Sequence, residues 1–170
     1  KLIREFFAFP ESFHGGITVA SGDMDGDGKD EILIAPQSGA HPLVRVFDGR
    51  GKMLQQFFAY NKTFTGGVNL QTARLDDTSR EVVIATPASN GGPQVRIFQL
   101  SKTAHKLVTQ FFAYSSGRRM GLSVAVGNIL QGGGQEIMVS PTEGKYPVEV
   151  RIFSSRGALR KQFYPASDRY

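Results

Sequence analysis

The sequence predicts an all-β protein made of three four-stranded antiparallel repeats of about 51 to 54 residues, preceded by one additional N-terminal strand. Two observations carry this prediction. Glycine accounts for 20 of the 170 residues and Phe, Val and Ile are plentiful, whereas no long segment places apolar residues at helical spacing. In addition, short motifs recur about fifty residues apart, as expected for a chain of structural repeats. No helix is required anywhere.

Three series of motifs recur in one register along the chain. One is an aromatic segment, Phe-Phe-Ala-Phe or Phe-Phe-Ala-Tyr, one is a pair of prolines six residues apart, and one is an Arg-Val-Phe or Arg-Ile-Phe triplet. The aromatic segments lie at 6–9, 57–60 and 111–114, the proline pairs begin at Pro36, Pro87 and Pro141, and the triplets begin at Arg45, Arg96 and Arg151. Because the arginines recur in every repeat, we expect them to be structural, either buried or between units.

These series define repeats at about residues 10–60, 61–114 and 115–166, with residues 1–9 as a strand of a preceding unit. Each repeat is expected to form an antiparallel meander. In the first repeat the strands are predicted at 16–22, 31–36, 43–48 and 53–60, and the additional strand at 3–9. The second of these strands is apolar on both faces, so each small sheet should be covered on both sides by stacked neighbours.

A dense group of acids separates the first two predicted strands. Acidic residues alternate through the loop, and Gly28 permits a sharp turn. Hard oxygen ligands at this spacing suit Ca²⁺. The predicted ligands are the side chains of Asp23, Asp25, Asp27 and Glu31 and the backbone carbonyl of Lys29.

Two other interpretations of this loop are less consistent with the sequence. An EF-hand requires a bidentate Glu at the twelfth loop position and a helix on each side, but the twelfth position is Ile34, within a β-branched segment. A solvated acidic turn would leave five acids in nine residues to repel one another without a counter-ion, and it explains neither the alternation nor the glycines.

The corresponding loops of the later repeats lack this pattern. In the second repeat Arg74 replaces the first acid and only Asp76, Asp77 and Glu81 are acidic, so a guanidinium is expected to substitute for the ion. In the third repeat Asn128 and Leu130 replace acids and only Glu136 is kept. The sequence therefore predicts one Ca²⁺ per chain.

Composition narrows the range of partners. The chain carries 20 basic and 15 acidic residues, for a net charge of +5, and the basic excess lies in residues 101–170. These basic residues are scattered rather than interleaved with aromatic residues, so nucleic acid is not an expected partner. No segment approaches the roughly twenty apolar residues of a membrane span. With no cysteine, the chain has no disulfide framework or thiol chemistry.

The segment GDMDGDGKDEILIAP, followed by LVRVF, resembles the FG-GAP or VCBS repeat, the blade unit of integrin-α-type β-propellers. The resemblance covers nearly the whole chain and is weakest at the second and third acidic loops. It implies four-stranded β-propeller blades around an axis, Ca²⁺ between the first two strands on one face, and partner contacts through the loops of the opposite face. It also implies an extracellular or cell-surface location and a role in adhesion.

Three blades are fewer than the four to eight of an ordinary closed propeller. The remaining blades are therefore expected either from a longer chain or from homo-oligomerisation, in which two copies would close one ring.

The third repeat departs from the others at positions that the resemblance places on the partner-binding face. Arg118 and Arg119 replace Phe64 and Thr65, and a further cation and an aromatic residue follow in the next loop of that face. The candidate ligand-binding residues are Arg118, Arg119, Lys145 and Tyr146. Such a surface suits an acidic glycan or an acidic protein surface, the alternative being a merely solvated basic surface.

No catalytic motif is evident. The histidines form no HExxH pair, no GxSxG elbow or phosphate-binding glycine loop occurs, and the clustered acids are explained by a metal. We therefore expect a binding module and not an enzyme. The alternatives are a non-catalytic accessory domain of an extracellular polysaccharide-acting enzyme, or a purely structural repeat.

Overall fold

The computed structural model describes residues 1–75, 80–130, 134–143 and 146–165. These residues form twelve β-strands and no helix, and so none of them belongs to a helix long and apolar enough to cross a membrane. The strands are β1 (Ile17–Gly22), β2 (Glu31–Pro36), β3 (Leu43–Phe47), β4 (Met53–Phe58), β5 (Val68–Ala73), β6 (Val82–Pro87), β7 (Gln94–Leu100), β8 (His105–Phe112), β9 (Leu122–Gly127), β10 (Glu136–Pro141), β11 (Val150–Ser154) and β12 (Leu159–Phe163).

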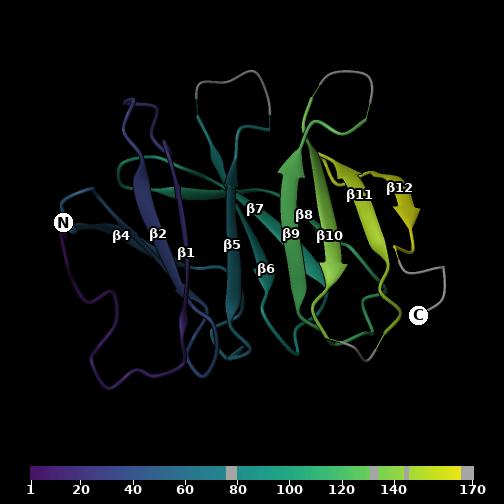
Figure 1. The fold of residues 1–170 in the computed structure, drawn as a ribbon, viewed down its shortest axis with the longest axis horizontal. Helices are drawn as coiled ribbons and strands as arrows, with labels where there is room; N and C mark the ends of the chain where they lie inside the picture. Colours follow the sequence, from purple (N-terminus) through teal and green to yellow (C-terminus); the bar gives the residue numbers. More distant parts are fainter. Residues whose placement is uncertain (76–79, 131–133, 144–145, 166–170) are drawn as a thin grey trace.

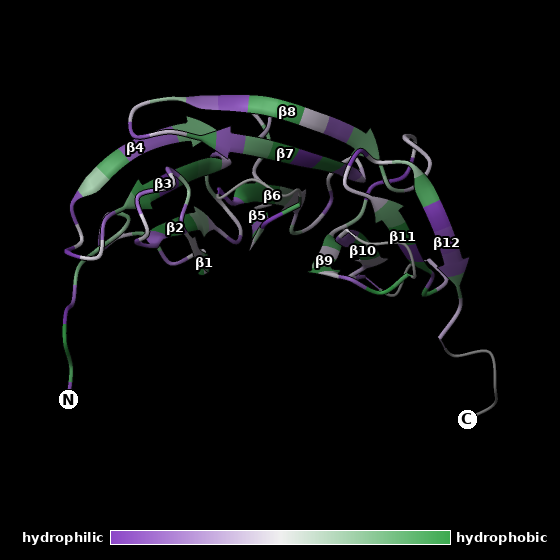
Figure 2. Cartoon of the chain, turned by 90° about the horizontal axis from the view of Figure 1, so that it is seen from above, coloured by the Kyte–Doolittle hydropathy of each residue, from purple (hydrophilic) through white to green (hydrophobic). Residues whose placement is uncertain are grey.

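The strands form three four-stranded antiparallel sheets, each a meander of consecutive strands: β1 to β4, β5 to β8, and β9 to β12. The predicted all-β class and the three four-stranded repeats are confirmed. Within the described residues, the sheets lie side by side along an arc, with β1, β5 and β9 on its inner side and β4, β8 and β12 on its outer side (Figures 1 and 2). β5 contacts both β1 and β9, so the inner strands link neighbouring sheets.

The predicted strand ends of the first sheet differ slightly from the observed ones. β1 starts after Gly16, whose φ of 72° lies in the left-handed region. β3 ends before Asp48, because the carboxylate of Asp48 accepts hydrogen bonds from the amides of Arg50 and Lys52 and so forms the turn. β4 ends at Phe58, two residues before the predicted end at Tyr60.

Apolar side chains fill the space between neighbouring sheets. The first interface joins Leu33, Val44 and Phe57 of the first sheet to Val83 and Phe98 of the second. A cluster of similar composition fills the second interface. In both interfaces an aromatic ring of the outer strand packs on a ring of the next sheet, with centroids 4.9 Å apart for Phe57 and Phe98 and 4.8 Å apart for Phe111 and Phe153. The apolar cores of the protein thus lie between neighbouring sheets.

The three recurring arginines, Arg45, Arg96 and Arg151, fasten each sheet to the segment that precedes it. They donate from Nη1 to the carbonyl oxygens of Ala8, Ala59 and Ala113 at 2.6, 2.9 and 2.9 Å, and they lie 4.7, 5.2 and 4.7 Å from the ring centroids of Phe9, Tyr60 and Tyr114. The expectation of structural arginines between units is confirmed. We call this arrangement the arginine clamp.

Residues 3–9 form no strand within the described part of the chain, because this segment pairs with no other strand there. Its place as a strand of a preceding unit stays a prediction. The segment nevertheless contacts the first sheet as the other aromatic segments contact theirs. Phe6 packs on Phe47 with ring centroids 5.0 Å apart, and Ala8 accepts the hydrogen bond of the arginine clamp. Residues 6–9 therefore make the side-chain and carbonyl contacts that the aromatic segments of the fourth strands make, although their backbone has no sheet partner.

Candidate functional site

The acidic loop between β1 and β2 spans residues 23–30, because the strands pair as far as Gly22 and Glu31. Gly26 and Gly28 have φ values of 83° and 84°, which side-chain-bearing residues rarely adopt. These two residues turn the backbone so that consecutive amides point inward. The amides of Gly26, Asp27, Gly28 and Lys29 all donate to aspartate carboxylates of the loop, over 2.7 to 3.1 Å.

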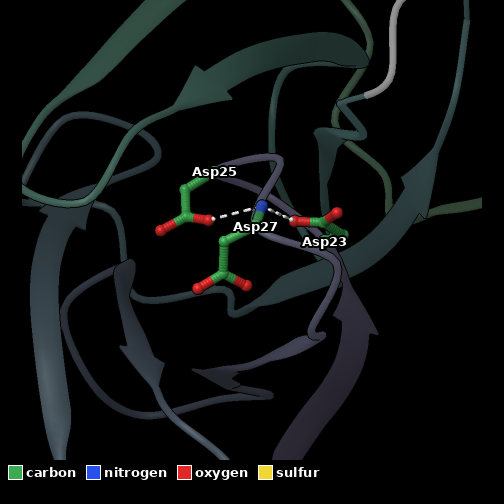
Figure 3. A group of neighbouring side chains, drawn as sticks. All are labelled: Asp23, Asp25 and Asp27. Carbon is green, nitrogen blue, oxygen red and sulfur yellow. Dashed lines mark hydrogen bonds between the residues drawn. The ribbon is translucent and has the colours of Figure 1, made fainter.

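Three aspartates converge within this loop. Asp23, Asp25 and Asp27 each contribute a carboxylate oxygen to a group whose members all lie within 4.8 Å of one another. Figure 3 shows the amide of Asp27 donating to both Asp23 and Asp25. The backbone amides thus hold the three carboxylates in position. Such a cluster can hold a metal ion.

In both Asp25 and Asp27, one carboxylate oxygen accepts a backbone hydrogen bond and the other faces a lysine. Oδ1 of Asp25 accepts from the Asp27 amide and Oδ1 of Asp27 accepts from the Lys29 amide, both in ordinary hydrogen bonds. Oδ2 of each lies 3.9 and 4.0 Å, respectively, from Nζ of Lys102, in the β7–β8 loop of the next sheet. The Lys102 ammonium group therefore lies beside the two carboxylate oxygens that accept no backbone hydrogen bond. The oxygen donors of the loop are of the kind that a hard cation such as Ca²⁺ prefers.

Glu31 is buried, with 7% of its surface exposed, and its Oε2 accepts a hydrogen bond from the Met24 amide at 3.0 Å. Burial raises the pKa of the Glu31 carboxyl; the Met24 hydrogen bond opposes this shift, and the negative charges of the three aspartates add to it. Glu31 therefore has a structural contact in addition to its predicted role as a ligand. For Lys29 the structure gives an amide contact with Asp27, while its carbonyl as a ligand stays a prediction.

The corresponding loops of the other sheets are different. In the third, Oε2 of Glu136 accepts hydrogen bonds from the amides of Ile129 and Leu130 at 2.9 and 3.2 Å, and these bonds lower the pKa of Glu136. In the second, Arg74 is exposed, and Asp76 and Asp77 lie outside the described residues. Among residues that the structure describes, the three aspartates are the only group of three or more potential metal-ligating side chains.

The second candidate site lies at the opposite ends of the strands. The turn that contains Arg118 and Arg119 precedes β9, whereas the acidic loop follows β1, so the two lie on opposite rims (Figure 1). The Arg118 guanidinium lies 4.9 Å from the ring centroid of Tyr146. Arg119 is exposed, and its Nη1 donates to the carbonyls of Ser116 and Arg118. Lys145 is outside the described residues.

The structure thus brings two of the predicted ligand-binding residues, Arg118 and Tyr146, into direct contact. Sequence reasoning missed Lys102, because its charge reaches the acidic loop only through the packing of the second sheet against the first. Lys102 is far from Asp25 and Asp27 in the sequence, and only folding brings it close to them.

In a comparison with known protein families, residues 15–51 match the FG-GAP repeat. The matched segment contains β1, the acidic loop, β2 and β3. A search among curated proteins found no significant match for the chain.

Proposed function

Taking residues 15–51 as an FG-GAP repeat, we propose that the chain is a Ca²⁺-binding β-propeller module of a surface or secreted protein. In this proposal the acidic loop holds the ion. The opposite rim binds a protein or an acidic glycan in adhesion, and the module itself carries out no catalysis.

The observation that carries the proposal is the division of oxygens in the acidic loop. The loop amides hold one oxygen of Asp25 and one of Asp27, and the other oxygen of each faces the ammonium group of Lys102. Ca²⁺ takes six to eight oxygen ligands in flexible geometry, which carboxylates, carbonyls and water together supply. Asp23, Asp25, Asp27 and Glu31 would hold the ion. Burial raises the pKa of Glu31 and the charges of the three aspartates add to that shift; bound Ca²⁺ would relieve the repulsion from these charges.

The exposure of β1, compared with the other two inner strands, supports a further blade on the side of the first sheet that faces away from the second. Ile17, Val68 and Leu122 occupy the same position in their sheets, each paired with the first proline of a proline pair. Val68 and Leu122 are fully buried by neighbouring sheets, whereas Ile17 is 46% exposed. A preceding blade, contributed by a longer chain or by a second copy, would cover Ile17 as the first sheet covers Val68.

Calorimetric titration with Ca²⁺ tests the proposal. We expect a stoichiometry near one and a Kd of about 0.1 to 1 mM, as in extracellular Ca²⁺ modules. Asp25→Ala should abolish the heat. Asp30→Asn is the matched control, since it removes one charge from the same loop at a position outside the aspartate cluster, and it should retain binding. No heat in the wild type, or equal loss in both variants, would contradict the proposal.

The ion should stabilise the chain only modestly. At about 1 mM Ca²⁺ and a Kd of about 0.1 to 1 mM, preferential binding to the folded state contributes about 0.4 to 1.4 kcal/mol to the free energy of unfolding. We therefore expect Tm to rise by a few degrees, measured by calorimetry with Ca²⁺ and with excess chelator. Complete unfolding by the chelator would contradict this expectation.

A further inference from the structure

A groove of about 330 Å³ opens on the rim of the second sheet. It lies between the segment after β4, the loop between β6 and β7, and the segment after β8, on the rim opposite the acidic loop. Its volume is near the lower end of the range for small-molecule sites, about 300 to 1,000 Å³, so it suits one small ring. The residues that matter here are Asn61, Asn90, Gly92, Phe112 and Arg119.

The groove is open because of one departure from the repeat. Gly92 precedes the second proline of its pair, and the residues in the same place in the first and third units are His41 and Tyr146. The His41 ring lies edge-on to Phe58, with centroids 6.4 Å apart, and its Nδ1 donates to the Lys62 carbonyl at 2.5 Å. Tyr146 lies under the Arg118 guanidinium. Two units therefore fill this position with a ring, and the second unit has no side chain there.

The backbone does not require glycine at this position. Gly92 is not among the residues with positive φ, and an added Cβ would meet only ordinary contacts, 3.8 Å from the Phe112 ring and 3.9 Å from Nη1 of Arg119. The missing side chain thus has a different effect: it leaves a space with an aromatic ring on one side and a guanidinium on the other.

The walls of this space have a specific chemistry. Phe112 is 50% exposed, and the carbonyls of Ser116 and Arg118 hold Nη1 of Arg119 in position. Since those carbonyls take Nη1, Nε and Nη2 remain as donors of a planar fork that matches a carboxylate. None of the described lining residues carries a carboxylate. Oε1 of Glu143 accepts a hydrogen bond from the Asn90 amide at 3.2 Å.

Two carboxamides complete the groove. Oδ1 of Asn61 accepts from the amide and hydroxyl of Thr63, which leaves its NH₂ group as a donor. Asn90 has a φ of 46°, and its side chain has no hydrogen bond within the described part of the chain. An aromatic face, carboxamide groups and the Arg119 guanidinium together match a sugar ring that bears a carboxylate, because the ring offers an apolar face, hydroxyl groups and one negative charge.

We propose that the groove at Gly92 binds a hexuronate unit of an acidic glycan, with the sugar ring against Phe112 and its carboxylate on Arg119. The proposal rests on the proposed function as a binding module and specifies its ligand class. It centres the groove on Gly92 of the second unit and keeps Arg119, one of the residues that the sequence favoured in the third repeat, as the partner of the carboxylate.

The test is a titration of the isotope-labelled chain, followed by amide NMR, with glucuronate and galacturonate as probes and glucose and galactose as neutral counterparts. We expect the amides of Asn90, Gly91 and Gly92 to shift with at least one uronate. The neutral sugar of the same configuration should bind about tenfold more weakly or worse, since it lacks the carboxylate that pairs with Arg119. Absence of shifts with either uronate would overturn the proposal.

Substitutions at the groove sharpen the test. Gly92→Tyr should abolish binding by placing in the groove the residue that the third unit carries, and Gly92→His should do so with the residue of the first. Gly92→Ala is the matched control and should retain binding, given its ordinary Cβ contacts. Arg119→Gln should remove the preference for uronate over the neutral sugar. Unchanged binding by both ring variants, or an unchanged preference, would overturn the proposal.

Two further measurements separate the possible failures. The Ca²⁺ titration of Gly92→Tyr should match that of the wild type, which shows that the variant folds and that loss of uronate binding is local; if it does not, Gly92→His provides the measurement. A short polyglutamate peptide that shifted the same amides more strongly than the uronates would assign the groove to an acidic protein and overturn the glycan proposal. Failure of Ca²⁺ binding with intact uronate binding would contradict only the proposed metal site.

Discussion

The loop between β1 and β2 and the loop between β9 and β10 occupy the same place in two sheets, and both end in a glutamate with the same contact. Glu31 accepts the amide of Met24, and Glu136 accepts the amide of Ile129, in each case seven residues earlier in the chain. Yet the pKa is raised for Glu31 and lowered for Glu136. Burial raises it for Glu31, and the neighbouring aspartates add to that shift, whereas amide hydrogen bonds dominate for Glu136.

This difference separates two roles within one motif. The glutamate closes the hairpin loop in both sheets, so its recurrence alone does not indicate a metal site. The aspartate cluster is present in the first loop, and there it creates a concentration of negative charge that favours a cation. The proposed Ca²⁺ binding thus depends on the three aspartates, which the first loop adds to the glutamate contact that both loops share.

The largest expected effect is on the free energy of unfolding when an arginine of the arginine clamp is replaced. The first and third units share the clamp but differ in what surrounds the arginine. Arg151 also pairs with the buried Glu149: Nη2 donates to Oε2 at 3.2 Å, and Nε lies 3.2 Å from Oε1 without hydrogen-bond geometry. Arg151→Met should reduce the free energy of unfolding by about 3 to 5 kcal/mol, since it leaves a buried charge unpaired. Arg45→Met should cost about 1.5 to 3 kcal/mol, the worth of a hydrogen bond from a charged donor.

Urea denaturation of the two variants measures the difference. A Glu149→Gln substitution added to Arg151→Met should recover part of the loss, because the uncompensated charge is then removed. Equal losses for Arg151→Met and Arg45→Met, without recovery in the double variant, would show that Glu149 makes no difference between the two clamps.

A smaller effect is expected at Lys102, which distinguishes the first acidic loop by placing a cation beside it. In the proposed site, Ca²⁺ would displace this ammonium group from Asp25 and Asp27. The Lys102 side chain is 72% exposed, so its ion pair with the aspartates is worth about 0.2 to 1 kcal/mol. Lys102→Gln should therefore tighten Ca²⁺ binding by up to about fivefold. Calorimetry measures this, with Lys106→Gln on the same hairpin as the control; weaker binding in Lys102→Gln would contradict the assignment.

The smallest expected effect is in pH dependence. The pKa of Glu136 lies below its ordinary value of 4.5, so the folded state binds this proton less tightly than the unfolded state. Its contribution to stability is present above about pH 4.5 and disappears as the pH falls through the lowered pKa. For Glu31 the sign is opposite: ionisation costs stability as the pH rises from 4.5 through the raised pKa. Carboxyl NMR titration of the metal-free chain should place the two values on opposite sides of 4.5, and values on the same side would contradict the comparison.

Much of the fold follows from local patterns in the sequence. β2 has the predicted bounds, because a short apolar segment lies between an acidic loop and a proline. β4 ends earlier than predicted, because Tyr60 leaves the sheet and its hydroxyl donates to the carbonyls of Ala85 and Gln94 in the next sheet. Such a contact depends on how the sheets pack, and no pattern within one repeat indicates it.

The candidate sites divide in the same way. The aspartate cluster is visible in the sequence, because all of its members lie within one short loop. The groove at Gly92 depends on segments from three parts of the chain. Its sequence signals are Arg119, a candidate ligand-binding residue from the sequence, and the comparison of Gly92 with His41 and Tyr146. Glycine at that position is readily interpreted as part of a turn, and only the structure shows that a ring is missing.

The central claim is that the first acidic loop binds Ca²⁺ and the third does not. Amide NMR of the isotope-labelled chain during a Ca²⁺ titration tests it most directly, because it observes both loops in one sample. We expect the amides of Gly26, Asp27, Gly28 and Lys29 to shift and saturate together, since each donates to an aspartate of the cluster. The amides of Ile129 and Leu130 should remain unchanged. Saturable shifts at Ile129 and Leu130, or none in the first loop, would contradict the account.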